Sequence, residues 1–407
     1  MSSIHWPDRA GSYMRKLCIE IPSRRVGSQG NRAATDFFTE RMESFGFQTE
    51  SPAFECMDWS QAGTQVSVGE VPFEAFASPY TTGCQASAPL KVASNAAELE
   101  GAELTQTVLL LRGDLAKEPL MPKNFPFYNP EEHKHILQLL EVKKPLAILA
   151  ATSRNEEMAG AMYPFPLIED GDFDIPSVFM TEEEGDRLAE MAGQEVSVVI
   201  QARRIPARGC NVIARKVADP ACRVVLFAHI DAKYGTPGAI DNATGTVVLL
   251  LLAELLADYT GRLGVEIVAL NGEDYYSNPG EQLYLEMNAG RFGEILLGIN
   301  LDGVGYMYGK TAYSLYGCPP PLAGLIRNVF SAHQDLVEGE PWVQGDHGLF
   351  VMNQRPALAL TSERVFEIMA EIVHTSKDTP EIVASAQLSA SALALRDLIL
   401  QLELFAE

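Results

Sequence analysis

The chain has 407 residues, of which 47% are apolar and 21% are charged, so it can build a large core and is neither a fibrous repeat nor wholly disordered. Its 54 acidic residues outnumber its 31 lysines and arginines and give a formal net charge of −23. A surface this acidic repels phosphate, which argues against nucleic acid or an anionic membrane as a partner. At roughly 100–200 residues per domain, the length predicts two or three domains.

The first residues contain no long apolar run of the kind found in secretory signals. The longest apolar stretch, Val247 to Leu256, is too short to cross a bilayer. Six widely spaced cysteines form no C-x-x-C pair and are expected to be free thiols. We therefore expect a cytoplasmic protein without a membrane span.

The first 50 residues predict two helices separated by the polar turn PSRRVGSQGN. The second helix is expected from about Asn31 to Phe45, because Ala34, Phe38 and Met42 recur there at helical spacing. Gly46 follows as a stop signal.

Residues 55–204 have a different pattern. Short apolar runs such as TVLLLRG and LAILAA predict strands, and a helix is expected at about 130–142. Thr181 and Glu184 fit a capping box at the start of another helix, and the proline-rich segment 119–130 predicts an irregular loop. We interpret 55–204 as a smaller α+β domain, inserted into a discontinuous domain made of 1–54 and 205–407.

From Asn211 onward, apolar strands alternate with helices. The expected strands are RVVLFAH, VEIVAL, EILLGIN and ALALTS, and a long helix follows Ala384. Strands this apolar are typical of a parallel sheet that is buried on both faces. The predicted fold class is therefore α/β, a doubly wound and mostly parallel sheet with helices on both faces.

Polar residues stand where these strands end, and others stand beside a helix start and in a late loop. They are His229, Asp231, Glu273, Asp274 and Asp302 after strands, Asp241 before a helix, and His374 in the loop. Ligands of such sheets bind beyond the carboxyl ends of the strands, and imidazole with carboxylate is the ligand set of zinc. Several carboxylates brought together would raise one another's pKa unless a cation balanced them. Convergence of these residues would therefore predict a divalent metal site.

Six motifs that contain these residues occur in a recognisable order. They are His229-Ile-Asp231, GAIDNATG around Asp241, NGED at Glu273-Asp274, NLDG at Asp302, GDHGLF at Asp346-His347, and HTSKDT at His374. Together they resemble the M28 family of zinc aminopeptidases over roughly residues 10–50 and 205–400. The inserted segment 55–204 is similar to the protease-associated domain of many family members.

The resemblance implies a set of roles for these residues. Asp241 would bridge two zinc ions, one held by His229 and Asp302 and the other by Asp274 and His374. Glu273 would be the general base, and Asp231 would orient the His229 imidazole. Asp346 and His347 are expected in the substrate pocket.

One position departs from the family, which has Glu-Glu where this chain has Glu273-Asp274. Two zinc ions are expected, and a single ion stays open because aspartate is one methylene shorter. The implied activity is the release of N-terminal residues from peptides by metal-activated water, with a peptide as the substrate partner. A single-zinc glutaminyl cyclase and a non-catalytic, receptor-like peptide binder stay open as alternatives, as does a homo-oligomer.

Overall fold

The computed structural model describes residues 5–405 except 22, 124, 126–128, 155–162, 170, 172, 218–221 and 343–344. The chain forms two compact units, one made of Met1–Cys56 and Arg208–Glu407 (unit 1) and one made of Met57–Ala207 (unit 2). Among the described helices, none is both long and apolar enough to cross a membrane.

Unit 1 is built on an eight-stranded sheet with the order β1-β10-β12-β11-β13-β16-β14-β15. These strands are β1 (Gln48–Glu50), β10 (Val212–Lys216), β11 (Arg223–His229), β12 (Gly264–Leu270), β13 (Ile295–Leu301), β14 (Thr311–Tyr316), β15 (Leu336–Glu338) and β16 (Ala357–Ser362). The four central strands are parallel, whereas β10 and β14 run antiparallel to their central neighbours. The predicted doubly wound, mostly parallel fold is confirmed, and the antiparallel flanks are features that the apolar pattern did not indicate.

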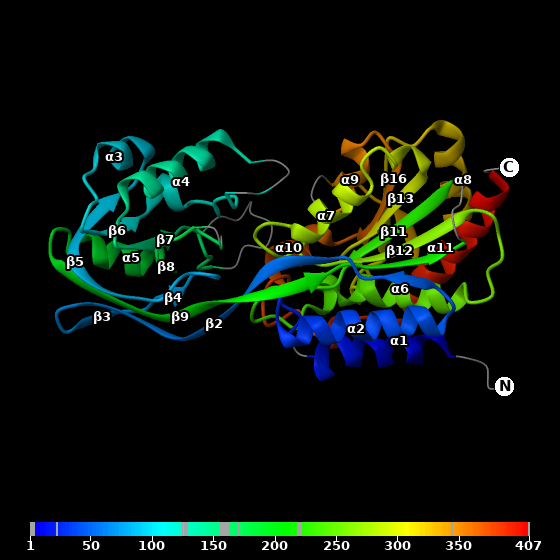
Figure 1. Ribbon diagram of the computed structural model, residues 1–407, viewed down its shortest axis with the longest axis horizontal. Helices are drawn as coiled ribbons and strands as arrows, with labels where there is room; N and C mark the ends of the chain where they lie inside the picture. The colour runs from blue at the N-terminus through cyan, green and yellow to red at the C-terminus, as the bar shows by residue number, and fades with distance from the viewer. Residues whose placement is uncertain are drawn as a thin grey trace. The chain divides into compact units, whose positions relative to one another are not determined.

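Helices cover both faces of this sheet (Figure 1). They are α1 (Trp6–Arg15), α2 (Gln29–Ser44), α6 (Thr244–Leu255), α7 (Pro279–Met287), α8 (Pro320–Phe330), α9 (Gly348–Met352), α10 (Val365–Glu371) and α11 (Ser385–Phe405). Figure 1 shows α1, α2 and α6 on one side of β11 and β12, and α7 and α9 on the other. The interior of the unit is therefore the pair of layers on either side of the sheet.

Alternate residues of β11 face opposite layers, as the period of a strand requires. Val224, Leu226 and Ala228 are fully buried in the core that includes α6 and α11. Phe227 faces the other layer, where its ring lies 4.9 Å from Tyr284 of α7 and 4.7 Å from Phe350 of α9. His229 is in phase with Phe227, so the strand directs its imidazole toward the face covered by α7 and α9.

The expected helix at 31–45 is confirmed as α2. The Ser28 hydroxyl caps its first turn by accepting from the Asn31 N–H at 3.1 Å. Ala34, Phe38 and Met42 are fully buried in the unit 1 core, as their spacing predicted. The Ser28 cap and the buried face of α2 therefore fix the preceding turn within unit 1.

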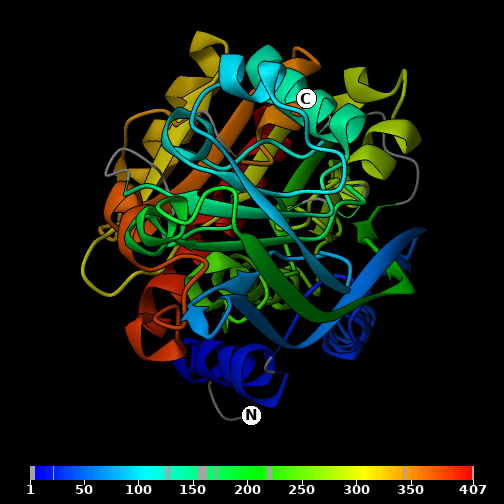
Figure 2. The same ribbon diagram turned by 90° about the vertical axis from the view of Figure 1, so that its left-hand side faces the viewer.

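Unit 2 contains a second eight-stranded sheet, with the order β3-β2-β9-β5-β6-β7-β8-β4. Its elements are β2 (Ala53–Val68), β3 (Val71–Phe73), β4 (Phe76–Ala77), β5 (Cys84–Ala93), α3 (Ala96–Gly101), β6 (Val108–Leu111), α4 (Glu131–Lys143), β7 (Ala147–Thr152), β8 (Ser177–Thr181), α5 (Glu182–Ala189) and β9 (Glu195–Cys210). Apolar residues of α3 and α4 share a core with β6 and β7. Within this unit the green strand β9 lies beside β5 in Figure 2, and the two strands pair antiparallel.

The predicted helix start at Thr181 is found in α5. The Thr181 hydroxyl accepts from the Glu184 N–H at 3.1 Å. The Glu184 carboxylate, however, accepts from the Glu74 backbone N–H at 3.0 Å. Glu184 thus ties α5 to the segment before β4. The expected loop at 119–130 has residues outside the described part of the chain.

Candidate metal centre

Three of the predicted site segments leave the sheet side by side. β11 ends at His229, β12 leads into the loop with Glu273 and Asp274, and β13 leads into Asp302. The strands lie in the order β12-β11-β13 and are parallel, so their carboxyl ends meet at one edge of the sheet.

Asp241 lies between two imidazoles. Its Oδ1 is 3.0 Å from His229 Nε2, and its Oδ2 is 3.0 Å from His374 Nε2. Asp274 Oδ1 is also 3.0 Å from His374 Nε2, and Asp302 Oδ1 is 3.8 Å from His229 Nε2. The structure therefore brings together all five residues that the sequence nominated as metal ligands.

Several polar atoms of this cluster are buried without a hydrogen-bond partner among the described residues. They are both ring nitrogens of His229 and Oδ2 of Asp274. Buried polar atoms are almost always hydrogen-bonded or bound to an ion. His229 Nε2 lies 3.0 Å from Asp241 Oδ1 and 3.8 Å from Asp302 Oδ1. Such spacings fit ligand atoms that each lie about 2.0–2.2 Å from one shared cation. The imidazole and carboxylate groups present here therefore fit zinc.

Burial and neighbouring charges shift the pKa of several groups in the cluster. Burial alone would raise the pKa of Asp241, but the imidazoles of His229 and His374 lower it. Burial lowers the pKa of His229, whereas the carboxylates of Asp231 and Asp241 raise it well above its usual value. Burial is the main cause that raises the pKa of Glu273 well above its usual value; His229 opposes this shift and Asp274 adds to it.

Asp231 contacts two parts of the site. Its Oδ1 is 3.7 Å from His229 Nδ1, which is longer than a hydrogen bond, so the orienting role expected for Asp231 stays a prediction. The same carboxylate accepts from the Gly272 N–H at 2.7 Å and the Asp274 N–H at 3.1 Å. Asp231 therefore also holds the backbone on both sides of Glu273, a contact that the sequence did not indicate.

Three buried asparagines hold the same loop, and sequence reasoning missed them. Asn31 and Asn271 exchange two side-chain hydrogen bonds, of 2.8 and 3.0 Å. Asn211 accepts from the Asn271 N–H at 3.1 Å. Asn31 belongs to the turn PSRRVGSQGN and Asn271 to NGED, so both stood in quoted motifs, but nothing in either motif links them. The loop with Glu273 is thus tied to the N-terminal segment.

Asp346 and His347 differ in their surroundings. Burial, reinforced by the carboxylates of Glu281 and Glu273, raises the pKa of Asp346 well above its usual value. His347 Nε2 lies 3.0 Å from the Trp342 carbonyl, and burial lowers the pKa of this imidazole to about 4. Asp346 therefore lies within the electrostatic reach of Glu273, whereas His347 is a neutral ring packed against Trp342.

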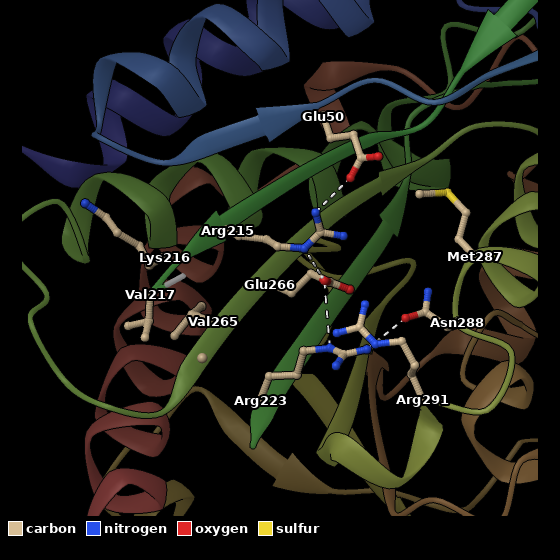
Figure 3. A pocket seen from close by; sticks show the side chains of 11 residues that line it. Glu50, Arg215, Lys216, Val217, Arg223, Val265, Glu266, Met287, Asn288 and Arg291 are labelled. Carbon is tan, nitrogen blue, oxygen red and sulfur yellow. Dashed lines mark hydrogen bonds and ion pairs between the residues drawn. The ribbon is translucent and has the colours of Figure 1, made fainter. Parts of the chain in front are cut away.

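A second group of charged residues lies at the other end of the same strands, around a cavity of about 340 Å³ (Figure 3). Figure 3 shows Glu266 between Arg215 and Arg223. Arg215 lies 2.7 Å from Glu266 and 2.8 Å from Glu50, and Arg223 pairs with Glu294. Each carboxylate here has a guanidinium partner, so these charges largely neutralise one another.

Comparisons with known proteins show which family profile and which folds this chain is similar to. Residues 211–399 match the profile of peptidase family M28. The chain is 24% identical over 294 residues to the probable lipoprotein aminopeptidase LpqL of Mycobacterium tuberculosis, a match that covers 69% of this chain and 54% of LpqL. The chain spans about half the length of the curated relatives it matches.

Solved structures share the fold. The aminopeptidase from Aneurinibacillus sp. strain AM-1 superposes with a TM-score of 0.74 at 19% identity, over 97% of this chain and 93% of that one. BSAP, a zinc aminopeptidase from Bacillus subtilis, gives 0.74 at 18%, over 99% and 96%. A glutaminyl cyclase from Macrostomum lignano gives 0.54 at 13%, over 98% and 89%. With this shared fold and the profile match, the segment 211–399, which contains His229, Asp241, Asp274, Asp302 and His374, belongs to peptidase family M28.

Proposed function

We propose that this chain is a zinc-dependent aminopeptidase that releases N-terminal residues from peptides. The main support is the position of Asp241, whose two oxygens lie 3.0 Å from the imidazoles of His229 and His374. A carboxylate placed between two imidazoles suits a bridge between two cations. The proposal extends the family membership of 211–399 to the activity of the whole chain.

The proposed ligands divide into two sets that share Asp241. His229 and Asp302 would hold one zinc ion, and Asp274 and His374 would hold the other. A single ion remains the alternative, because Asp274 is shorter than the glutamate of the family pattern. When bound, zinc supplies a Lewis acid that acidifies water and polarises the scissile carbonyl.

Glu273 is the proposed general base. Its carboxylate accepts a proton from the water whose oxygen bonds to the scissile carbonyl carbon. It then passes that proton to the nitrogen that departs when the C–N bond breaks. Asp231 keeps this carboxylate in place through the Gly272 and Asp274 N–H groups.

The proposal is tested by substrate hydrolysis together with metal analysis. Aminoacyl-p-nitroanilides and dipeptides should be cleaved by the purified protein, chelation should abolish cleavage, and zinc should restore it. Elemental analysis should find about two zinc ions per chain, or one if Asp274 binds poorly. A protein that contains no zinc and gains no activity from zinc, cobalt or manganese would contradict the proposal.

A glutaminyl cyclase is the second candidate, supported by the fold likeness at a TM-score of 0.54 and by the shorter Asp274. Such an enzyme would form pyroglutamate from a peptide with an N-terminal glutamine and would release no amino acid. Mass spectrometry of that peptide separates the two activities. A receptor-like peptide binder would show neither product and no bound zinc.

We also propose that unit 2 is a domain of the protease-associated type that supplies no ligand to the metal centre. All the proposed ligands belong to unit 1. Replacing 57–207 by a short linker should therefore leave the zinc content intact and change the preferred peptide length. Loss of zinc from a variant whose unit 1 stays folded would contradict this assignment.

A further inference from the structure

The segment 230–241 connects His229 with Asp241 and is held by two buried charged residues. Arg24 lies in the turn before α2, and Asp378 follows His374 by four residues. Their exposed fractions are 1% and 0%. Charged side chains are rarely fully buried unless they are paired or hydrogen-bonded.

Arg24 binds three carbonyl oxygens of this segment. Its Nε donates to the Ile230 carbonyl at 3.0 Å, Nη1 to the Pro237 carbonyl at 2.9 Å, and Nη2 to the Gly238 carbonyl at 2.6 Å. Nη1 also donates to the Leu17 carbonyl at 2.9 Å. The planar guanidinium thus fixes both ends of the stretch 230–238 with one rigid group.

Asp378 binds the next residues of the segment from the amide side. Its Oδ1 accepts from the Ile240 N–H at 2.6 Å, and its Oδ2 accepts from the Asp241 N–H at 3.1 Å. The Asp378 carbonyl accepts from the Ala239 N–H at 3.3 Å. Three consecutive amides therefore donate to a single residue. The last of them belongs to Asp241 itself.

The backbone around Asp241 needs such support. Asp241 has φ −118° and ψ 88°, which is not helical although it lies just before α6. Gly238 has φ +59°, and a Cβ there would lie 2.8 Å from Arg24 Nη2 and 2.7 Å from the Asp241 carbonyl oxygen. Regular secondary structure therefore does not hold this turn, and its close packing leaves no room for a side chain at Gly238.

We propose that Arg24 and Asp378 are positioning residues that set the zinc affinity of the site by fixing Asp241 between His229 and His374. The inference rests on the proposed function, because it takes Asp241 as the shared zinc ligand. The Arg24 guanidinium binds carbonyl oxygens of the segment, and the Asp378 carboxylate binds its amide N–H groups. Each charge thus binds the end of the peptide dipole that has the opposite sign. Asp378 lies in the same segment as His374. Displacement of Asp378 would therefore disturb two proposed ligands, Asp241 and His374.

The test is a zinc titration of metal-free protein in competition with a chromogenic chelator. Asp378→Asn keeps the shape of the side chain but turns an NH2 group toward one of the two amides. Arg24→Lys keeps the charge but cannot reach three carbonyls at once. Each variant should keep the parent's far-ultraviolet circular dichroism and bind zinc about 10–100-fold more weakly, the usual cost of removing an outer partner of a metal ligand.

Glu266→Gln is the matched control, because Glu266 is also a buried charge of unit 1, with an exposed fraction of 2%, at the other end of the strands. It should lower the melting temperature and leave the zinc affinity within about twofold of the parent. Hydrogen exchange of the peptide that covers 236–243 gives a readout without metal. Exchange there should increase in Asp378→Asn and Arg24→Lys and stay unchanged in Glu266→Gln.

Two results would overturn the inference. The first is a folded Asp378→Asn and a folded Arg24→Lys that bind zinc like the parent and exchange like it. The second is unfolding of both variants with or without zinc, which would assign these residues to the stability of the whole unit. If the parent and Glu266→Gln also bind no zinc, the proposed function fails, while the exchange experiment still decides whether Arg24 and Asp378 hold the segment.

Discussion

Unit 1 has two clusters of charged side chains at opposite ends of the same strands, the metal centre around Asp241 and the cavity cluster around the buried Glu266, and their charges are balanced in different ways. Arg223 and His229 are the first and last residues of the seven-residue strand β11, about 20 Å apart at the usual rise of a strand. Around the cavity, both oxygens of Glu266 have partners, the Tyr284 hydroxyl at 2.6 Å and Arg215 at 2.7 Å. At the metal centre, His229 and Asp274 keep buried polar atoms without hydrogen bonds.

The difference teaches how to recognise a site among buried charges. A cluster in which each carboxylate has a guanidinium or hydroxyl partner is complete as it stands, and its role is to hold the strands together. A cluster of carboxylates and imidazoles with unpartnered atoms is complete only when a cation joins it. Arg223 Nε at the cavity also lacks a hydrogen bond, so the property that separates the clusters is narrower: only the metal centre leaves imidazole nitrogens and a carboxylate oxygen, atoms that can bind a cation, without a partner.

The largest expected effect concerns Glu273, which we place in the chemistry and not in metal binding. Glu273→Gln should lower kcat by about 100-fold to 10,000-fold because the amide cannot accept the proton of water. Zinc content should stay that of the parent. Steady-state kinetics with parallel elemental analysis measures both, with the exposed Glu286→Gln on α7 as the control. Activity close to that of the parent would remove Glu273 from this role.

A large effect on stability is expected at the other cluster. Glu266→Gln removes the carboxylate that Arg215 and Arg223 share and should lower the free energy of unfolding by about 3 kcal/mol, as breaking a buried ion pair commonly does. Urea unfolding measures this loss. If the same variant also weakened zinc binding tenfold, the two clusters would not be independent and the comparison would fail.

The Asp274 position gives an intermediate effect on zinc affinity. Its Oδ1 already lies 3.0 Å from His374 Nε2, the distance that separates the same nitrogen from Asp241. The short side chain therefore reaches the cluster, and we expect Asp274→Glu to crowd it and weaken zinc binding by about tenfold, with a larger loss for Asp274→Ala. Zinc titration of the three proteins decides this. Identical curves would show that Asp274 is not a ligand.

The smallest effect concerns Glu281, a buried carboxylate near the metal centre whose Oε2 has no hydrogen bond. Burial, reinforced by Asp231, raises the pKa of Glu281 from 4.5 to about 7. The folded metal-free protein therefore keeps a proton that the unfolded chain loses between these two values. The contribution of this group to stability is full below about pH 4.5 and is lost as the pH rises to about 7.

Glu281→Gln should therefore raise the melting temperature of the metal-free protein by a few degrees at pH 8 and by little at pH 5. Glu266→Gln should lower it at both values, because Glu266 has partners on both oxygens. Calorimetry at the two pH values compares the variants directly. A shift for Glu281→Gln that is the same at both values would contradict the assigned pKa.

Much of the fold followed from local patterns. The apolar run RVVLFAH predicted a buried strand, and the helical spacing of Ala34, Phe38 and Met42 predicted α2. The strand β14 escaped because TAYSLY mixes polar and apolar residues and lies near the edge of the sheet, where one neighbour is the short β15. The first four residues of β14 are buried although Thr311 and Ser314 are polar, so the apolar pattern under-reports the burial of this strand.

His229, Asp274 and Asp302 were nominated from the amino-acid sequence because residues that follow strand ends of an α/β sheet belong to one edge. Asp241 and His374 follow no strand, and their expected role as ligands came from the family resemblance. The convergence of the first three depended on the strand order β12-β11-β13, which no local pattern contains. The residues that support them were decided by tertiary structure alone: Asn31 and Asn271 are hydrogen-bonded across 240 positions, and Arg24 and Ile230 across 206. A hydrogen bond between such distant residues leaves no periodic trace, because it depends on how the whole sheet folds and not on neighbouring side chains.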